Sequence, residues 1–166
     1  LNRGKKSITL DLAKAEGKAV LQRLAARADA LVSNLRGDVP AKLGIRPGQR
    51  AWLVGVPADV EAPLQASLAE TKRLSRLAAF DVALVFVASR PRLAAALDRI
   101  APKMDDAGMI WIAWPKRASG VKSDVTEDAV RADALPRGLV DVKVCAIDPT
   151  WSGLKLVRRR ELRSKR

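Results

Sequence analysis

The chain has 166 residues, 48% of them hydrophobic, which suits one domain with an aliphatic core and a smaller appendage. It contains no His and one Cys, so a Ser-His-Asp triad, an imidazole base, a His metal site and an intrachain disulfide are excluded. Its formal net charge of +13 permits nonspecific attraction to nucleic acid, to anionic membrane surfaces or to phosphorylated ligands, although arginines on solvated faces explain the charge more simply. No apolar run approaches the ~20 residues of a spanning helix. Cys145 lies in a strand pattern, where we expect a small core residue, and a single Cys fits a reducing, cytoplasmic setting.

The first part of the chain predicts a strand, a helix and a second strand. Residues 7–12, SITLDL, alternate and are β-branched, which favours a strand. Residues 13–28 carry apolar side chains at helical spacing, and residues 29–32 form a short second strand before a loop at 33–38. A βαβ unit is therefore expected here. The sequence starts without Met, so we expect a fragment or an internal start.

Strands and helices alternate after the turn signal Arg46-Pro47-Gly48-Gln49. Apolar and β-branched runs predict strands at 50–56, 71–75, 80–88, 109–113, 139–148 and 154–159. Helical spacing predicts helices at 57–68, from Ser89 to the segment 105–108, and at 125–135. The expected N-caps are Asp59, Ser89 and either Ser123 or Asp124, and a turn at 149–153 should precede the last strand.

This alternation predicts an α/β fold: a Rossmann-like three-layer domain whose mainly parallel sheet ends in an antiparallel hairpin, with the N-terminal βαβ unit as an appendage. Strands 80–88 and 109–113 should be adjacent, parallel and central. A final antiparallel hairpin is typical of Rossmann-like methyltransferase folds. The usual middle strand and its helices have no room in the segment 74–79.

The opening segment carries three motifs in order: NRGKKSITLDL, EGKAVLQRLAARADALVSN and a short VPAKLG segment. Together they resemble the N-terminal part of family III CoA-transferases. The resemblance implies an early Rossmann-like βαβ unit that helps to hold CoA. It implies CoA contacts at Leu10, Asp11, Leu12, Asn34, Leu35, Arg36 and Lys42.

The chain departs from that family in two ways. The family usually has Glu-Asn-Phe where this chain has Ser33-Asn34-Leu35. The match ends near Leu43-Gly44, and the later segment with the nucleophilic Asp that forms the acyl anhydride has no counterpart. Taken by themselves these residues need no ligand, because Asn34 and Arg36 can make turn hydrogen bonds and a basic run is usually a solvated face.

A second set of motifs covers residues 41–160. It comprises the KLGI-x-PG turn at 42–48, Trp114-Pro115-Lys116, Ser119-Gly120-Val121, Asp124-Val125-Thr126 and Trp151-Ser152-Gly153-Leu154. These motifs resemble an uncharacterised bacterial family, domain of unknown function 3052, which implies a small α/β domain without established chemistry. We therefore expect a CoA-transferase-like fragment at 1–44, a Rossmann-like domain at 45–160 and a basic tail at 161–166.

Two turns are candidate ligand sites. The turn after the first strand of the second part, residues 55–59, has one Gly and a Pro and lacks the glycine fingerprint of nucleotide-binding folds, so S-adenosylmethionine is not expected. The segment 108–120 is an apolar strand running into a basic loop, where a crevice for a small anion could form. That crevice would use Trp114, Lys116, Arg117, Ser119, Gly120 and Trp151. The simpler alternative is that Trp151 packs over the sheet end and Lys116 is solvated.

No residue has a strong claim to be a catalytic acid, base or nucleophile. The leading expectation is a non-catalytic Rossmann-like domain fused to a CoA-transferase-derived segment. One alternative is a CoA-binding subunit or remnant of a family III CoA-transferase that works with a complete partner. The other is a basic protein that associates with nucleic acid without sequence preference.

Overall fold

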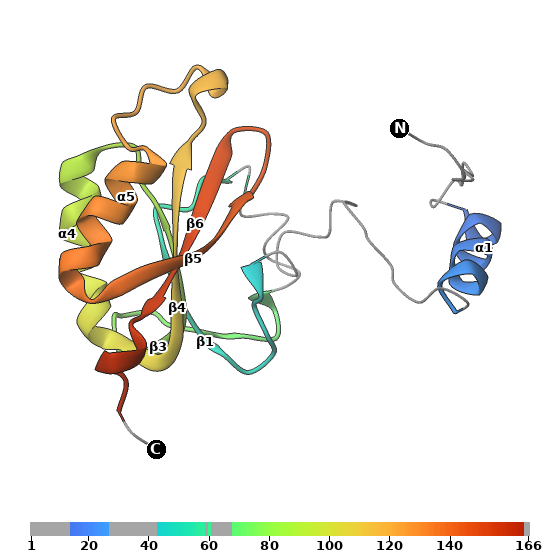
Figure 1. The fold of residues 1–166 in the computed structure, drawn as a ribbon, viewed down its shortest axis with the longest axis horizontal. Coiled ribbons are helices and arrows are strands. Elements are labelled where there is room, and N and C mark those ends of the chain that lie inside the picture. The colour runs from blue at the N-terminus through green and yellow to red at the C-terminus, as the bar shows by residue number, and fades with distance from the viewer. Residues whose placement is uncertain (1–13, 27–42, 59, 61–67, 165–166) are drawn as a thin grey trace. The chain divides into compact units, whose positions relative to one another are not determined.

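The computed structural model describes residues 14–26, 43–58, 60 and 68–164 (Figure 1). The chain forms two compact units, Leu1–Arg36 and Gly37–Arg166, and each is described by itself. In the first unit, helix α1 spans Ala15–Ala25, with Glu16 in its first turn and Arg23 in its last. These charges complement the helix dipole. The strands predicted at 7–12 and 29–32, which would flank this helix, lie outside the described residues.

The second unit is built on a six-stranded sheet in the order β2-β1-β3-β4-β6-β5. The first four strands of that order are parallel, whereas β6 runs antiparallel to both β4 and β5. β3 and β4 are adjacent, parallel and central, as predicted. The strands are β1 (Arg50–Val54), β2 (Lys72–Arg73), β3 (Phe80–Phe86), β4 (Met104–Pro115), β5 (Leu139–Ala146) and β6 (Trp151–Arg158).

Both faces of the central strands β3 and β4 are buried, which confirms the three-layer, Rossmann-like prediction. Helices α4 (Arg90–Ile100) and α5 (Glu127–Ala134) pack against each other on one face (Figure 1). Alternate residues of β3 and β4 point to this side, where Leu93, Leu97 and Val130 cover them. The intervening residues point to the other side, where Leu43, Val60 and Leu68 belong to a second apolar cluster. The continuous apolar runs of β3 and β4 follow from this two-sided burial.

The largest correction to the predicted elements concerns the segment 105–108. It was expected to end a helix, but the helix stops at Ile100, and a 3-10 turn with Pro102 leads directly into β4. Pairing shifts between Phe80 and Val82, so β4 takes extra residues between Met104 and Met109. Residues 105–108 therefore lie in an irregular start of the strand, which hides the alternation that a regular strand shows.

Two further boundaries differ from the prediction. The hairpin turn is shorter than 149–153, because Trp151, Ser152 and Gly153 already pair within β6. Asp148 closes this turn, as expected of a turn residue, by accepting the N–H groups of Thr150 and Trp151 at 2.7 and 2.6 Å. The C-terminal segment is structured as far as Ser164, with a 3-10 turn at Arg160–Leu162.

The helix caps also differ in part. α5 begins at Thr126, whose hydroxyl accepts the N–H of Ala129 at 3.2 Å, rather than at Ser123 or Asp124. Ser89 is the N-cap of α4 by position, but its side chain makes no capping bond. The helix predicted at 57–68, with its Asp59 cap, lies largely outside the described residues. No described helix is long and apolar enough to cross a membrane.

Candidate functional site

A crevice opens at the carboxyl ends of β1 and β3. The chain leaves β1 for β2 on one side and leaves β3 for β4 on the other, so the strand order reverses between β1 and β3. In open α/β sheets, this reversal separates the two crossovers and leaves a ligand crevice. Here the crevice holds about 470 Å³ and is lined by Val54, Gly55, Phe86, Val87, Ala88, Arg92, Ala95, Ala96, Arg99 and Trp151.

Gly55 brings the ends of the two strands close together. It follows β1 with φ of 63°, a left-handed conformation that favours glycine. A Cβ atom at this position would lie 2.8 Å from the carbonyl oxygen of Phe86 at the end of β3. Glycine is thus required both by the backbone conformation and by the close approach of β3. The single Gly of the predicted 55–59 turn therefore shapes the floor of the crevice.

Two arginines of α4 supply the charge of the crevice. Arg92 and Arg99 are seven residues apart, so they lie two turns apart on one face of the helix. The methyl groups of Ala95 and Ala96 lie between them and take little space. Both arginines are exposed, and among the described residues neither has a hydrogen-bond or ion-pair partner.

Several other arginines of this unit are held by carboxylates. Arg131 donates to Asp141 at 2.9 Å, and Arg137 donates to Asp98 at 2.7 Å. Among the described residues, the lining of the crevice contains no carboxylate. Arg92 and Arg99 therefore leave a surface of positive potential that a carboxylate or phosphate could neutralise.

Aromatic side chains form another wall. Trp151 meets Phe86 edge to face, with ring centroids 5.1 Å apart and planes 75° apart. This geometry is favourable for aromatic pairs, and it fixes the indole at the rim of the crevice. The described residues of the lining carry no Asp, Glu, Lys, Ser or Cys side chain, and the groups that they offer are suited to binding. The described residues also contain no cluster of acidic or Cys side chains able to hold a metal ion.

The loop predicted as a crevice after β4 is arranged differently. Trp114 lies in the core beneath α4 and α5, whereas Trp151 lies in the cluster on the opposite face of the sheet. The two indoles therefore cannot flank one crevice, and this part of the prediction is corrected.

The polar groups of the same loop bond to one another or to the adjacent turn. Lys116 Nζ donates to the carbonyl of Asp148 at 2.5 Å, and Ser119 Oγ donates to the carbonyl of Lys116 at 2.7 Å. Arg117 is exposed, and Gly120 ends the turn with φ of 74°. Of the six predicted residues, Trp151 alone lines the crevice at the strand ends.

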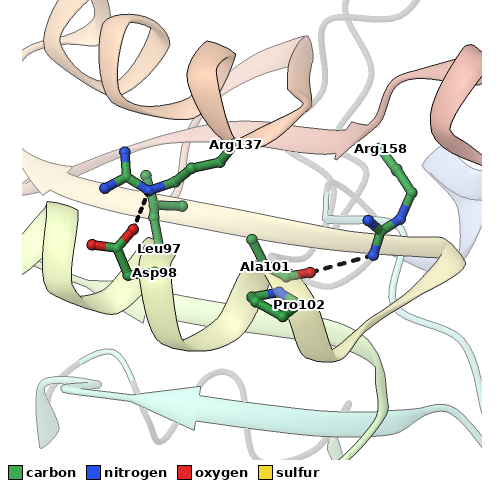
Figure 2. A pocket seen from close by; sticks show the side chains of 6 residues that line it. All are labelled: Leu97, Asp98, Ala101, Pro102, Arg137 and Arg158. Carbon is green, nitrogen blue, oxygen red and sulfur yellow. Dashed lines mark hydrogen bonds and ion pairs between the residues drawn. The ribbon is translucent and has the colours of Figure 1, made fainter.

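A separate hollow of about 270 Å³, which does not join the crevice, lies at the other end of α4 between Asp98, Arg137 and Arg158 (Figure 2). Arg137 and Arg158 reach into it, but both are already engaged. Arg137 pairs with Asp98, which lowers the pKa of that carboxyl through the hydrogen bond. Arg158 Nη2 donates to the carbonyls of Met104 at 2.7 Å and Ala101 at 3.3 Å. These contacts fasten the end of α4 to the sheet, so the hollow is a structural junction.

The CoA contacts implied by resemblance lie at Leu10, Asp11, Leu12, Asn34, Leu35, Arg36 and Lys42, all outside the described residues. Arg92 and Arg99 were not among the site residues predicted from the sequence. Their signal was the spacing Arg-x-x-Ala-Ala-x-x-Arg on the helix that follows the most apolar strand. That spacing marks one helix face with two cations and a small-residue floor.

Comparison with known proteins gives one family match. CoA-transferase family III matches residues 1–51. No curated protein matches the chain. The match covers the segment that the opening motifs indicated and extends slightly beyond Leu43-Gly44 into the start of β1.

Solved structures with a similar fold include several methyltransferases. Magnesium protoporphyrin IX methyltransferase from Synechocystis PCC 6803 is 11% identical, with a TM-score of 0.49 over 87% of this chain and 95% of that chain. The ribosomal protein L11 methylase from Lactobacillus delbrueckii subsp. bulgaricus is 8% identical, with a TM-score of 0.48 over 74% of this chain and 76% of that chain. Fibrillarin from Methanococcus jannaschii is 11% identical, with a TM-score of 0.46 over 69% and 68%. The similarity is confined to the fold.

Proposed function

We propose that the second unit is a non-catalytic Rossmann-like domain that binds a small anionic molecule in the crevice at the ends of β1 and β3. The observation that carries the proposal is the pair Arg92 and Arg99, which line this crevice with no carboxylate among the other described lining residues. Guanidinium groups bind carboxylates and phosphates through two parallel hydrogen bonds. The first unit is then a segment derived from a CoA-transferase, attached to this binding domain.

The proposal that this domain is non-catalytic is supported by the described side chains that line the crevice. Its charged groups are arginines, which keep their protons at all ordinary pH values and cannot act as general bases. Its other side chains are aliphatic or aromatic, apart from Gly55. A ligand would be held by charge and by apolar contact, without a group placed to attack it.

The test is a titration with inorganic pyrophosphate at constant ionic strength, followed by calorimetry and by amide chemical shifts. We expect shifts at Gly55, Val87 and Ala88, and binding weakened about tenfold or more in the double variant R92A/R99A. The matched control is R117A/R159A, which removes the same charge from exposed arginines outside the crevice. An equal loss of pyrophosphate affinity in both double variants would show that binding depends only on net charge, which would overturn the proposal. Unchanged affinity in R92A/R99A would also overturn it.

The family match favours a second candidate, CoA binding by the CoA-transferase-like segment 1–44. Residues 1–51 match CoA-transferase family III, and the resemblance implies contacts that include Arg36 and Lys42. In this case the chain would be a CoA-binding subunit or remnant that works with a complete transferase. CoA should then bind to wild type and to R92A/R99A, and binding should weaken in R36A/K42A. No binding at millimolar CoA would reduce the match to common ancestry.

A further inference from the structure

The crevice continues into a second, apolar hollow of about 270 Å³ along α4. Val54, Gly55, Ala96 and Arg99 line both hollows. Trp52, Leu53, Leu77 and Ile100 line the second hollow alone, whereas Arg92 lines the first alone. Charge is thus concentrated at one end of the combined space, and apolar surface at the other. Arg99 lies at the junction, where its aliphatic stem can contact apolar atoms while its guanidinium stays in water.

This second hollow exists because the chain has no helix between β2 and β3. The segment 74–79 passes directly from one strand to the other, and Leu74 and Leu77 pack against the core beneath α4. α4 follows β3, so it leaves Trp52 and Val54 of β1 only half-buried. A row of apolar side chains therefore remains open to solvent beside a charged rim. Burying such surface is favourable at roughly 25 cal/mol per Å².

Resting on the proposed function, we propose that the ligand is an amphipathic anion. Its carboxylate lies between Arg92 and Arg99, and its apolar chain lies in the second hollow against Trp52, Leu77 and Ile100. A compact polar anion such as phosphate satisfies the arginines but leaves the second hollow wet. An uncharged apolar molecule fills the second hollow but leaves both guanidinium groups without a partner. A medium-chain carboxylate pairs with the arginines through its charged group and fills the second hollow with its alkyl chain.

Three straight-chain carboxylates test this inference: butyrate, hexanoate and octanoate, at constant ionic strength. Affinity should rise about two- to fourfold for each methylene that reaches the second hollow. Trp52 provides a direct signal, since it lines this hollow alone among the four Trp residues. Octanoate should shift the Trp52 indole N–H resonance and pyrophosphate should not. Both titrations use the wild-type protein, and the variant W52F serves only to assign the resonance by its loss.

Substitutions then separate the two ends of the site. L77Q should abolish the dependence on chain length while pyrophosphate still binds. The matched control is L74Q, because Leu74 packs against the same core but lines neither hollow. R92A/R99A should weaken octanoate about tenfold or more.

The outcomes distinguish this inference from the proposed function. Equal affinities for butyrate and octanoate, with pyrophosphate still bound at Arg92 and Arg99, would overturn the inference and leave the proposed function intact. If neither pyrophosphate nor octanoate binds, both the inference and the proposed function are overturned. Octanoate binding that is unchanged in R92A/R99A would overturn the placement of the carboxylate.

Discussion

Arg50 binds Asp81 through its backbone and its side chain at once. The Arg50 amide donates to Asp81 Oδ2 at 2.7 Å, and Nη2 donates to Oδ1 at 2.8 Å. The same guanidinium also donates to Asp105 in the irregular start of β4. One arginine at the first position of β1 therefore joins the amino ends of three neighbouring strands. The hydrogen bond from the Arg50 side chain is the main cause that lowers the pKa of Asp81 below its ordinary value.

This pair should make stability depend on acid pH. A carboxyl whose pKa is lowered by folding stabilises the fold above its unfolded pKa, about 4, and that contribution disappears as the pH falls through the folded value. We expect D81N to lower the melting temperature at pH 7, and its difference from wild type to shrink as the pH falls below about 4. D98N is the control, because Asp98 is 63% exposed and its pairing with Arg137 is screened by solvent and salt. A constant difference between D81N and wild type at every pH would contradict this account.

Gly55 and Gly120 can be compared to distinguish two reasons for requiring glycine, which are a positive φ and a close contact with a neighbouring strand. Both have positive φ, 63° and 74°, but a Cβ at Gly55 would meet Phe86 at 2.8 Å, whereas Gly120 has nothing within 4 Å. We expect G120A to cost roughly 1–2 kcal/mol of unfolding free energy from the backbone conformation alone. G55A should cost clearly more, since β3 must also move. Urea denaturation of both variants measures the difference, and equal costs would show that the close contact relaxes freely.

Thr126 should stabilise α5 more than Ser89 stabilises α4. The Thr126 hydroxyl caps its helix, whereas the Ser89 side chain makes no capping bond. We expect T126A to lose about 1 kcal/mol in chemical denaturation and S89A to lose only a few tenths. The N–H of Arg90 at the start of α4 is instead accepted by Asp124 at 2.8 Å. D124A should therefore destabilise the protein more than S89A, and the reverse order would contradict this assignment.

Any binding to nucleic acid should be electrostatic and independent of sequence. The net charge of +13 is the basis of this prediction, and the affinity for duplex DNA should fall steeply with salt. Deleting residues 163–166 removes three cations and spares Arg158, which the fold uses to hold α4. The logarithmic salt slope should flatten by about 0.9 for each lost phosphate contact. A complex insensitive to salt, or a preference among unrelated sequences of equal length, would require a specific site.

The sequence predicted the central strands well because burial on both faces produces continuous apolar runs. It misplaced the start of β4 because Asp105, Asp106 and Gly108 do not alternate. They belong to the strand because Met104 and Met109, on either side of them, both pair with β3. The cap of α5 was ambiguous for a different reason. Ser123, Asp124 and Thr126 can all accept backbone N–H groups, and each accepts a different one. Tertiary contacts therefore determine which of these three residues caps α5.

The candidate site was harder to predict than the fold. Its position depends on strand order, and the reversal between β1 and β3 is a tertiary property. Trp114 and Trp151 lie at the same end of the sheet, on the neighbouring strands β4 and β6. Trp151 pairs with Pro115, so it shares a face with Pro115, and Trp114 points to the opposite face. The alternation of side chains across an antiparallel pair decides this, and the register cannot be deduced from two separate segments.

The position of β6 also affects how the protein is made. β6 follows β5 in the chain but lies between β4 and β5 in the sheet. β5 therefore leaves the ribosome before the strand through which it joins the sheet. Domains fold as the chain emerges, at roughly 5–20 residues per second, so one edge of β4 stays open until β6 has been synthesised. A nascent chain that has emerged from the ribosome only as far as the turn before Trp151 should have β1, β3 and β4 paired and β5 still available to chaperones.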